Sequence, residues 1–439
     1  MAVKADAVRP LALLGGPAAV TEPEGDAALF HWPIVTEEDE QAVVEVLRAG
    51  STSGIGITRE FEREYAAWAG AAHALATCNG TAGLLAAYWA CGVGAGDEVI
   101  CPSMTYWASA TPALSLGATV NFTDVEASTL CLDPADIEHR IGPRTRAIIV
   151  VHYAGHPADM DRIMPLARKH GLRVIEDNSH AQGARYKGKL TGSFGDVTVA
   201  SLMGGKSLVA GEGGMLTTDD RKLYERAVAF GHYERTGGPS RFARGEAVVH
   251  GELARFSGLP IGGVKHRINQ TCSAMGRVQL RHYDERIAEI QRAMNRFWSL
   301  LEDVPGLRPH RAPWAASTMG GWYYPRGLYR AQELGGLACA RFCEAVRAEG
   351  VTACNAGANM PLHLHAVFHE ADLFRQGRPT AVAFGQRDVR QGPGSLPVSE
   401  RIGEIAFGVP WFKRDDAGRI ERYAGAYRKV AEQAERLLA

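Results

Sequence analysis

The stretch "RAIIVVHYAGHPADMDRIMPLARKHGLRVIEDNSH", Arg146 to His180, holds two short apolar runs with a helical segment between them. The runs "RAIIVVHYAG" and "LRVIEDNSH" contain several Val and Ile residues, as buried strands do. The segment between them, "DMDRIMPLARKHG", is long enough for a helix. Strand, helix and strand in this order predict a βαβ unit with two parallel strands.

The same alternation extends from about residue 50 to about residue 220. The runs "DEVICP" and "ATVNFTDV" are further strands, and "AGLLAAYWACG" is a further helix. The sequence therefore predicts an α/β fold with a mainly parallel sheet, whose functional groups gather at the carboxyl ends of the strands.

Other segments define the organisation of the chain. Residues 36–50 read as a helix capped by Thr36. Residues 232–262 lose the alternation and are expected to form a lid or a dimer-contact arm. Residues 271–301 read as one long bridging helix, and residues 371–398, rich in Gly, Pro and Arg, as a surface loop.

The expected domains are an N-terminal extension over residues 1–35, a large domain over residues 36–270, and a bridging helix with a smaller C-terminal α/β domain over residues 271–439.

Composition and charge exclude several classes of protein. A formal net charge of -1 over 439 residues gives no reason to expect a nucleic acid or an anionic membrane as partner. The eight cysteines form no CxxC pair, so we expect neither a zinc site nor a disulfide framework. The N-terminus lacks the apolar core of a signal peptide, and no run of about 18 apolar residues suggests a membrane span. We therefore expect a cytoplasmic protein without a metal site.

Two clusters could bind a flat, phosphorylated ligand. In "CNGTAGLL", Gly80 and Thr81 open a helix whose free N–H groups could hold a phosphate. In "MTYWASA", Tyr106 and Trp107 follow a strand and are either core residues or a stacking wall.

Two further clusters carry charge. Asp177 ends the strand in "VIEDNSH", three residues before His180. It either caps the next helix or faces a cationic ring nitrogen, beside which a carboxylate stays ionised. In "SLMGGKSLVAGEGG", Lys206 follows Ser201 among glycines that allow close backbone approach. Its amine becomes nucleophilic only where its proton is easily lost.

Together these clusters match the needs of pyridoxal 5'-phosphate (PLP). This cofactor has a phosphate, a flat ring, a ring nitrogen that must stay protonated, and an aldehyde that bonds to a lysine amine. Each cluster alone is weak evidence, but the set in this chain order is strong.

The chain resembles the DegT/StrS family of PLP-dependent aminotransferases, which act mainly on keto sugars and cyclitols. The resemblance covers about residues 10–437 and is carried by "FEREYAAWAG", "GVGAGDEVICPSMTY", "GHPADMDRIM", "VIEDNSHAQGA" and "SLMGGKSLVAGEGGMLTTDD". It implies a type I, aspartate aminotransferase-like PLP fold and a homodimer with its sites at the subunit interface.

The resemblance also implies residue roles. Lys206 matches the lysine that bonds to the cofactor, and Asp177 matches the partner of the pyridine nitrogen. The remaining cofactor-binding positions are a ring contact, a stacking aromatic, a phosphate-binding turn and a phosphate-binding hydroxyl. In that order they are His180, Tyr106, Gly80 with Thr81, and Ser201.

The chain departs from the family pattern at two places. The family often has Asn-Tyr-Arg before the long helix, with the Asn reaching the neighbouring subunit's phosphate, whereas this chain has Lys265, His266 and Arg267. We expect Lys265 to make a charged version of that contact. The segment before Lys206 is "LMGG" where the family is usually Phe/Gln-rich, which predicts a roomier pocket.

The expected function is transfer of an amino group from glutamate or glutamine to a keto sugar or keto cyclitol, in amino-sugar or aminoglycoside-type natural-product biosynthesis. Polar residues of "GHYER" and "CNAGANMPLHLH" are candidate substrate contacts, or else surface loop residues: His232, Tyr233, Asn359 and His363. The alternatives are a PLP-dependent lyase, dehydratase or epimerase, and a non-catalytic regulator with the same fold. The lysine at position 206 argues against the sugar dehydratases that have His there.

Overall fold

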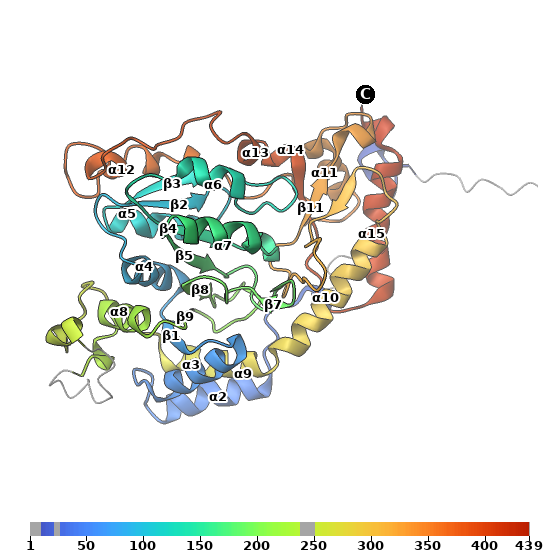
Figure 1. Cartoon of the computed structure of the whole chain (residues 1–439). Helices are drawn as coiled ribbons and strands as arrows, with labels where there is room; N and C mark the ends of the chain where they lie inside the picture. Colours follow the sequence, from blue (N-terminus) through green and yellow to red (C-terminus); the bar gives the residue numbers. More distant parts are fainter. Residues whose placement is uncertain (1–9, 22–26, 238–250, 439) are drawn as a thin grey trace, which may run out of the picture.

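The computed structural model describes residues 10–21, 27–237 and 251–438. At its centre lies a sheet of seven strands in the order β1-β9-β8-β5-β4-β2-β3 (Figure 1). Its strands are β1 (His73–Thr77), β2 (Glu98–Pro102), β3 (Thr119–Thr123), β4 (Thr145–Val151), β5 (Arg173–Asp177), β8 (Val197–Ser201) and β9 (Gly214–Thr218).

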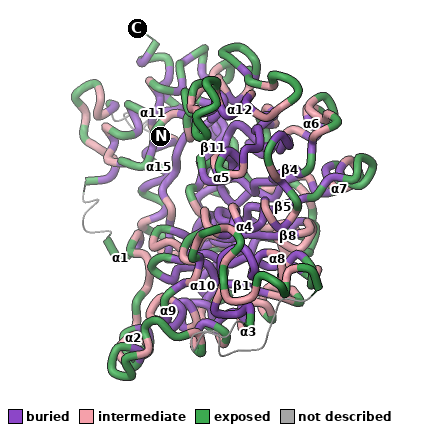
Figure 2. Tube along the Cα trace, turned by 90° about the vertical axis from the view of Figure 1, so that its left-hand side faces the viewer, coloured by how far each residue is buried: buried purple, intermediate pink, exposed green. Residues whose placement is uncertain are grey.

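The predicted mainly parallel sheet is confirmed. Strands β2, β3, β4, β5 and β8 pair in parallel, and β9 pairs antiparallel with β8 and β1. Because parallel strands share an orientation, β4, β5 and β8 end at one edge of the sheet. These strands are almost entirely buried (Figure 2), as strands between helical layers must be.

Two groups of helices cover the sheet. Helices α4 and α8 pack together and contact β9, while α6 and α7 pack together and contact β3 and β5 respectively. The helices of this half of the chain are α2 (Glu37–Arg48), α3 (Gly56–Ala69), α4 (Gly80–Ala90), α5 (Thr111–Ser115), α6 (Pro134–Arg140), α7 (Met160–Lys169) and α8 (Arg221–Gly231). The predicted capping of the first of these is confirmed: Asp39 accepts hydrogen bonds from the backbone N and the hydroxyl of Thr36.

The predicted single helix over residues 271–301 is wrong. The structure has two helices there, α9 (Gln270–Arg281) and α10 (Tyr283–Ser299), which meet at His282. Helix α9 packs against α2 and α3, whereas α10 packs against α15 (Ala417–Glu432). Because each helix buries its apolar face against a different partner, the chain turns between them (Figure 1).

The C-terminal part of the chain forms a second, smaller α/β unit. Its antiparallel sheet has the order β10-β11-β12, with β10 (Leu307–Pro309), β11 (Arg326–Tyr329) and β12 (Ala406–Gly408). Its other helices are α11 (Cys339–Ala348), α12 (Thr380–Ala383), α13 (Pro397–Glu400) and α14 (Ile402–Ile405). The remaining elements of the molecule are α1 (Ala27–Phe30) and the hairpin β6 (Arg185–Tyr186) and β7 (Lys189–Leu190).

The hydrophobic core follows this division. One cluster surrounds the seven-stranded sheet, and another joins α10, α11 and α15. Leu11, Val20 and Leu29 of the N-terminal segment pack into the second cluster, so the two ends of the chain share a core. The domain boundaries drawn from the sequence stay a prediction.

The remaining expectations about segments are partly met. Residues 371–398 are irregular apart from α12 and the start of α13, as predicted. Within residues 232–262, only short 3₁₀ segments are described, Tyr233–Arg235 and Gly251–Phe256, and residues 238–250 lie outside the described part. The role of this segment as a lid or dimer arm stays a prediction.

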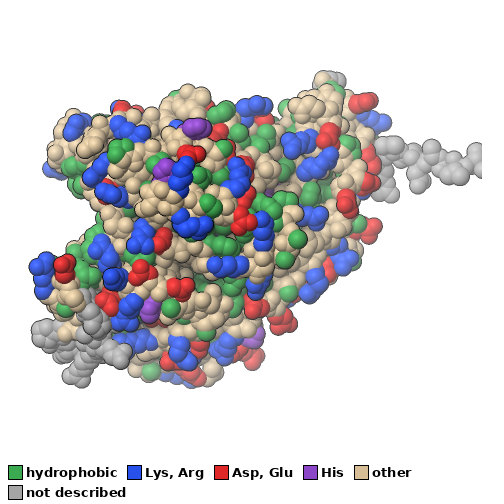
Figure 3. Space-filling model, in the orientation of Figure 1, with side chains coloured by type: hydrophobic (Ala, Val, Ile, Leu, Met, Phe, Trp, Pro, Cys, Tyr) green, Lys and Arg blue, Asp and Glu red, His purple; other side chains and the backbone are tan. Residues whose placement is uncertain are grey.

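The surface matches the balanced composition. Figure 3 shows Lys and Arg interspersed with Asp and Glu over the face in view, without a field of one sign. Among the described residues, no helix is both long enough and apolar enough to span a bilayer. All eight cysteines are unpaired.

Candidate active site

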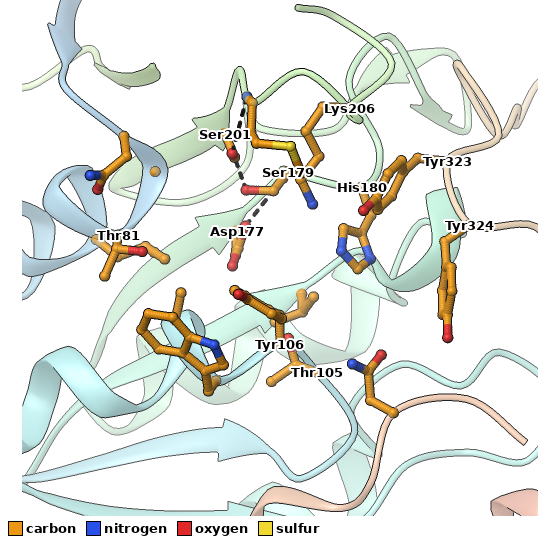
Figure 4. A pocket seen from close by; sticks show the side chains of 18 of the residues that line it. Thr81, Thr105, Tyr106, Asp177, Ser179, His180, Ser201, Lys206, Tyr323 and Tyr324 are labelled. Atoms are coloured by element: carbon orange, nitrogen blue, oxygen red, sulfur yellow. Dashed lines mark hydrogen bonds between the residues drawn. The ribbon is translucent and has the colours of Figure 1, made fainter. Parts of the chain in front are cut away.

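A cavity of about 500 Å³ lies where β4, β5 and β8 end. Its lining includes the last residue of each strand, Val151, Asp177 and Ser201. The other lining residues are Asn79, Gly80, Thr81, Leu84, Thr105, Tyr106, Trp107, Ala108, Ser179, His180, Met203, Lys206, Glu212, Tyr323, Tyr324 and Asn359. The cavity therefore brings together most of the residues that the sequence singled out (Figure 4).

The Asp177 carboxylate is fixed in this cavity by two hydrogen bonds. Ser109 Oγ donates to Oδ2 over 2.7 Å, and the backbone N of Ser179 donates to Oδ1 over 3.1 Å. The residue is buried and caps no helix, so the alternative of a helix cap is wrong. A buried carboxylate held in this way can face a cationic group in the cavity.

The start of helix α4 forms the opposite side of the cavity. Asn79 caps the helix by accepting a hydrogen bond from Ala82 N. Within the described residues, no hydrogen bond uses the backbone N–H of Gly80 or Thr81. Two free N–H groups at the positive end of a helix dipole are suited to a phosphate.

Gly80 is required at this turn by the approach of Ser201. A Cβ at position 80 would lie 2.9 Å from Ser201 Cβ, closer than side chains pack. The absence of a side chain brings the Ser201 hydroxyl beside the helix start, where it adds a third donor for an anion.

Lys206 places its amine in the same cavity. Its backbone is fixed by a hydrogen bond from Lys206 N to Met203 O and by one from Trp32 Nε1 to Lys206 O. Burial lowers the pKa of the Lys206 amine to about 8, although the nearby Asp177 carboxylate opposes the shift. An amine with this pKa loses its proton more easily than an exposed lysine, as a nucleophile or base must.

His180 lies beside the lysine on the same side of the cavity. Burial, reinforced by the charges of Lys206 and Arg326, lowers the pKa of His180 well below its usual value. The ring is therefore uncharged at neutral pH, and its Nδ1 accepts a hydrogen bond from Ala154 N. A neutral ring next to Lys206 adds no competing positive charge.

Two aromatic side chains form the open wall of the cavity. The rings of Tyr106 and Trp107 lie 5.0 Å apart, and both are nearly half exposed. Trp107 is therefore a wall residue, and the alternative that it is core is wrong. Such faces suit a flat or ring-shaped ligand.

Several cavity residues were not singled out in the sequence, among them Glu212, Thr105, Tyr323 and Tyr324. Glu212 follows the lysine loop, and Thr105 precedes Tyr106. Tyr323 and Tyr324 lie just before β11 in the sequence, more than 100 residues after Lys206. The aromatic run "WYYP" was their only signal, and nothing in it predicts that these tyrosines line the cavity.

Among the predicted substrate contacts, Asn359 does line the cavity, where it accepts a 2.6 Å hydrogen bond from Tyr153 OH.

His232 and His363 do not reach the cavity, and their prediction as substrate contacts is wrong. Both rings are fully buried. His232 Nε2 bonds Ala76 O, while His363 bonds Ser103 Oγ through Nδ1 and Glu400 through Nε2. Each ring holds chain segments together inside the fold.

Lys265 and Tyr233 lie elsewhere, along a shallow depression of about 370 Å³. Lys265 is exposed there, and Leu259 beside it is 74% exposed. The predicted contact of Lys265 with a neighbouring subunit stays a prediction.

The cavity fits PLP on its own geometry. Gly80, Thr81 and Ser201 offer donors for a phosphate, Asp177 a carboxylate for a ring nitrogen, Lys206 an amine for an aldehyde, and Tyr106 a ring face. By contrast, the described residues hold no cluster of three His, Cys, Asp or Glu side chains suited to a metal ion.

Comparison with known proteins supports this assignment. The sequence profile of the DegT/DnrJ/EryC1/StrS aminotransferase family matches residues 33–389. The chain is 34% identical over 386 residues to the L-glutamine:2-deoxy-scyllo-inosose aminotransferase of Streptoalloteichus tenebrarius, covering 84% of this chain and 86% of that protein. It is 38% identical over 263 residues to the GDP-perosamine synthase of Caulobacter vibrioides, covering 60% of this chain and 67% of that protein.

Solved structures of aminotransferases share this fold. The aminotransferase from Psychrobacter cryohalolentis superposes with a TM-score of 0.77 at 28% identity, over 92% of this chain and 100% of that one. The fold is therefore the type I PLP fold expected from the sequence. The chain belongs to the DegT/DnrJ/EryC1/StrS aminotransferase family.

Proposed function

We propose that this aminotransferase moves an amino group from glutamine or glutamate to a keto cyclitol or keto sugar, in aminoglycoside-type natural-product biosynthesis. The observation that carries the proposal is the convergence of the Lys206 amine, the Asp177 carboxylate and the free N–H groups of α4 in one cavity. The family's enzymes depend on PLP, and the cavity offers a group for each part of that molecule.

The relatives support a cyclitol as the preferred acceptor. The inosose aminotransferase aligns over 86% of its length, whereas the perosamine synthase aligns over 67% of its own. The longer match with the cyclitol enzyme favours a cyclitol acceptor for this chain.

The charge of the cavity supports the same acceptor. Among the described residues that line it, Lys206 is the only Lys or Arg, so the described lining offers no second cation for a nucleotide diphosphate. The hydroxyl of Thr105, the amide of Asn359 and the carboxylate of Glu212 can bond the hydroxyl groups of an uncharged ring.

Lys206 acts as the base and acid of the reaction. Because burial brings the pKa of its amine to about 8, a useful fraction is uncharged near neutral pH and can take a proton from the donor's α-carbon. With PLP bound, the resulting ammonium would return that proton to the aldehyde carbon of the cofactor. When bound, PLP supplies the conjugated ring that stabilises the electrons released from the α-carbon.

Other residues bind and orient the cofactor. Asp177, fixed by Ser109 and Ser179, keeps a proton on a ring nitrogen placed against it. Gly80, Thr81 and Ser201 bind the phosphate, and Tyr106 covers the ring. Lys265 is assigned to the phosphate of the neighbouring subunit in a homodimer. The exposed Leu259 lines the same depression, and with Phe256 and Ile261, exposed and close to it in sequence, it gives that interface an apolar surface.

A direct assay tests the proposal. The purified protein with PLP is incubated with glutamine, glutamate or alanine and with scyllo-inosose, 2-deoxy-scyllo-inosose or a GDP-linked keto sugar, and the amine product is measured by mass spectrometry. We expect an amine from a free keto cyclitol with glutamine or glutamate, and none with Lys206→Ala.

Other outcomes revise defined parts of the proposal. An amine only from the GDP-linked ketone would overturn the cyclitol assignment. Activity restricted to simple α-keto acids would overturn both acceptor classes while leaving an aminotransferase. Loss of water from the acceptor without amine formation would indicate a dehydratase.

A further inference from the structure

The amine of Lys206 faces the ring of a tyrosine from the second half of the chain. Lys206 Nζ lies 4.1 Å from the centroid of the Tyr323 ring. Figure 4 shows the amine between Asp177 on one side and Tyr323 with His180 on the other. An ammonium over an aromatic face is attracted by the ring's negative π surface.

The Tyr323 ring is itself held in place. Its centroid lies 4.7 Å from the His180 ring, and Trp411 packs edge-on against it at 5.6 Å. Trp411 Nε1 donates a hydrogen bond to Gly321 O, two residues before Tyr323. The ring and the backbone that carries it are therefore fixed by one side chain.

The segment that carries Tyr323 is pressed against the lysine loop. A Cβ at Gly321 would lie 2.3 Å from Ser207 Cβ, the residue after Lys206, and a Cβ at Gly320 would lie 2.3 Å from Gln182 O. Gly320 also has a φ of +55°, which side chains disfavour. Only glycines let this segment approach closely enough for Tyr323 to reach the amine.

The N-terminal segment holds the other end of the lysine. Trp32 Nε1 donates a 2.7 Å hydrogen bond to Lys206 O, and the Trp32 ring lies 6.0 Å from that of Trp411. Trp32, Tyr323 and Trp411 thus form an aromatic clamp, with one member on the backbone of Lys206 and one on its amine.

We infer that Tyr323 is a positioning residue whose ring face holds the free amine of Lys206 in the cavity, with Trp32 and Trp411 fixing the lysine backbone and the ring. The inference rests on the proposed role of Lys206 and adds a residue that lies outside the family motifs quoted above. Among the described residues no carboxylate is hydrogen-bonded to the Lys206 amine, whereas the Tyr323 ring face lies 4.1 Å from it.

The Tyr323 ring face affects the charge state of the Lys206 amine. The titratable side chains that share its cavity are Asp177, His180, Glu212, Tyr106, Tyr323 and Tyr324. Burial favours the uncharged amine, while Asp177 and the ring face favour the ammonium. Replacing the ring by leucine keeps an apolar side chain at this position and removes the ring's attraction for the ammonium.

The test is a pH titration of Lys206 in cofactor-free protein. A trace of an amine-acylating reagent is added from neutral to alkaline pH, and mass spectrometry measures how fast the Lys206 peptide is labelled. Because only the uncharged amine reacts, the midpoint gives its pKa. For Tyr323→Leu we expect the midpoint to fall by roughly half a unit to one unit, and for Tyr323→Phe we expect no change.

Two controls separate this effect from general disturbance. Tyr324→Leu removes a neighbouring cavity ring that lies over Arg326, at 3.4 Å, and should leave the midpoint unchanged. Tyr323→Met provides a second aliphatic variant if the leucine variant does not fold, as judged by circular dichroism. An unchanged midpoint in the aliphatic variants, or a fall in Tyr323→Phe equal to that in Tyr323→Leu, would overturn the inference.

Failure of the inference and failure of the proposed function are distinguishable. The titration uses no cofactor and no substrate, so it reports only the contact between Lys206 and Tyr323. Whether Lys206 is the residue that bonds PLP is decided separately, by reduction and peptide mapping of the loaded protein.

Discussion

The hydroxyl of Ser109 donates a 2.7 Å hydrogen bond to Oδ2 of Asp177. Ser109 in turn bonds Thr105 Oγ1 at 2.9 Å, so a short chain of hydroxyl groups orients the carboxylate at the end of β5. This arrangement leaves Asp177 in the cavity as an acceptor with a fixed direction.

Asp177→Asn should reduce turnover by roughly 10²–10³-fold while the protein remains folded, because an amide cannot keep a ring nitrogen protonated. Steady-state kinetics and circular dichroism measure the two effects. Ser109→Ala, which removes the orienting hydroxyl and keeps the charge, should cost much less turnover. Near-normal turnover in Asp177→Asn would show that the carboxylate has only a structural role.

Gly80→Ala should weaken PLP binding by at least about tenfold, because its Cβ would lie 2.9 Å from Ser201 Cβ and would part the helix start from that hydroxyl. Fluorescence titration of cofactor-free protein with PLP gives the affinity. The matched control is Gly425→Ala in α15, where nothing lies within 4 Å of the new Cβ. It should bind PLP normally, and equal losses in both variants would contradict the assigned turn.

Lys206→Met should stabilise the cofactor-free protein by roughly 1–3 kcal/mol at neutral pH, because it removes a buried ammonium. In the folded state the pKa of Lys206 is lowered to about 8 by burial. Below that pH both states hold the proton, and the folded protein carries the full cost of the buried charge.

As pH rises from about 8 toward the usual pKa of lysine, the folded state releases its proton first and this cost disappears. The gain in unfolding free energy of Lys206→Met over the unaltered protein should therefore shrink over that pH range. Urea unfolding at several pH values tests this, with Lys222→Met at an exposed position of α8 as the control. A difference in unfolding free energy between Lys206→Met and the unaltered protein that stays constant with pH would contradict the lowered pKa of Lys206.

Lys265→Ala should speed the loss of PLP on dilution, because a cation is removed from the phosphate of the neighbouring subunit. Release is followed by the fall in cofactor absorbance after dilution. Lys265→Arg should restore most of the retention. Unchanged cofactor retention in Lys265→Ala would show that this exposed lysine does not contact the phosphate.

Much of the fold followed from local patterns. Runs such as "DEVICP" and "RAIIVV" are continuous and apolar because both faces of their strands are buried, and strands of this kind are readable from sequence. The break at His282 was not readable, because residues on both sides favour a helix. Only the separate packing of α9 and α10 turns the chain there.

The candidate site was predictable where it lies next to a strand end or a helix start. Asp177, Ser201, Gly80 and Thr81 converge for that reason, because parallel strands deliver their last residues to one edge. Their roles in the reaction stay predictions.

Residues whose position depends on tertiary packing were not predictable. His232 and His363 occur in polar segments typical of a binding loop, yet packing buries both rings. Tyr323 reaches Lys206 only because glycines at positions 320 and 321 let two distant segments touch. No local pattern records that contact.

The proposed function depends above all on Lys206 being the amine that carries the cofactor. The most direct measurement is borohydride reduction of the PLP-loaded protein, followed by proteolysis and mass spectrometry of every lysine-containing peptide. We expect the phosphopyridoxyl group on Lys206, and we expect addition of glutamine or glutamate before reduction to remove this label. Phosphopyridoxyl on another lysine, or a Lys206 label that persists with every amino donor, would contradict this role of Lys206.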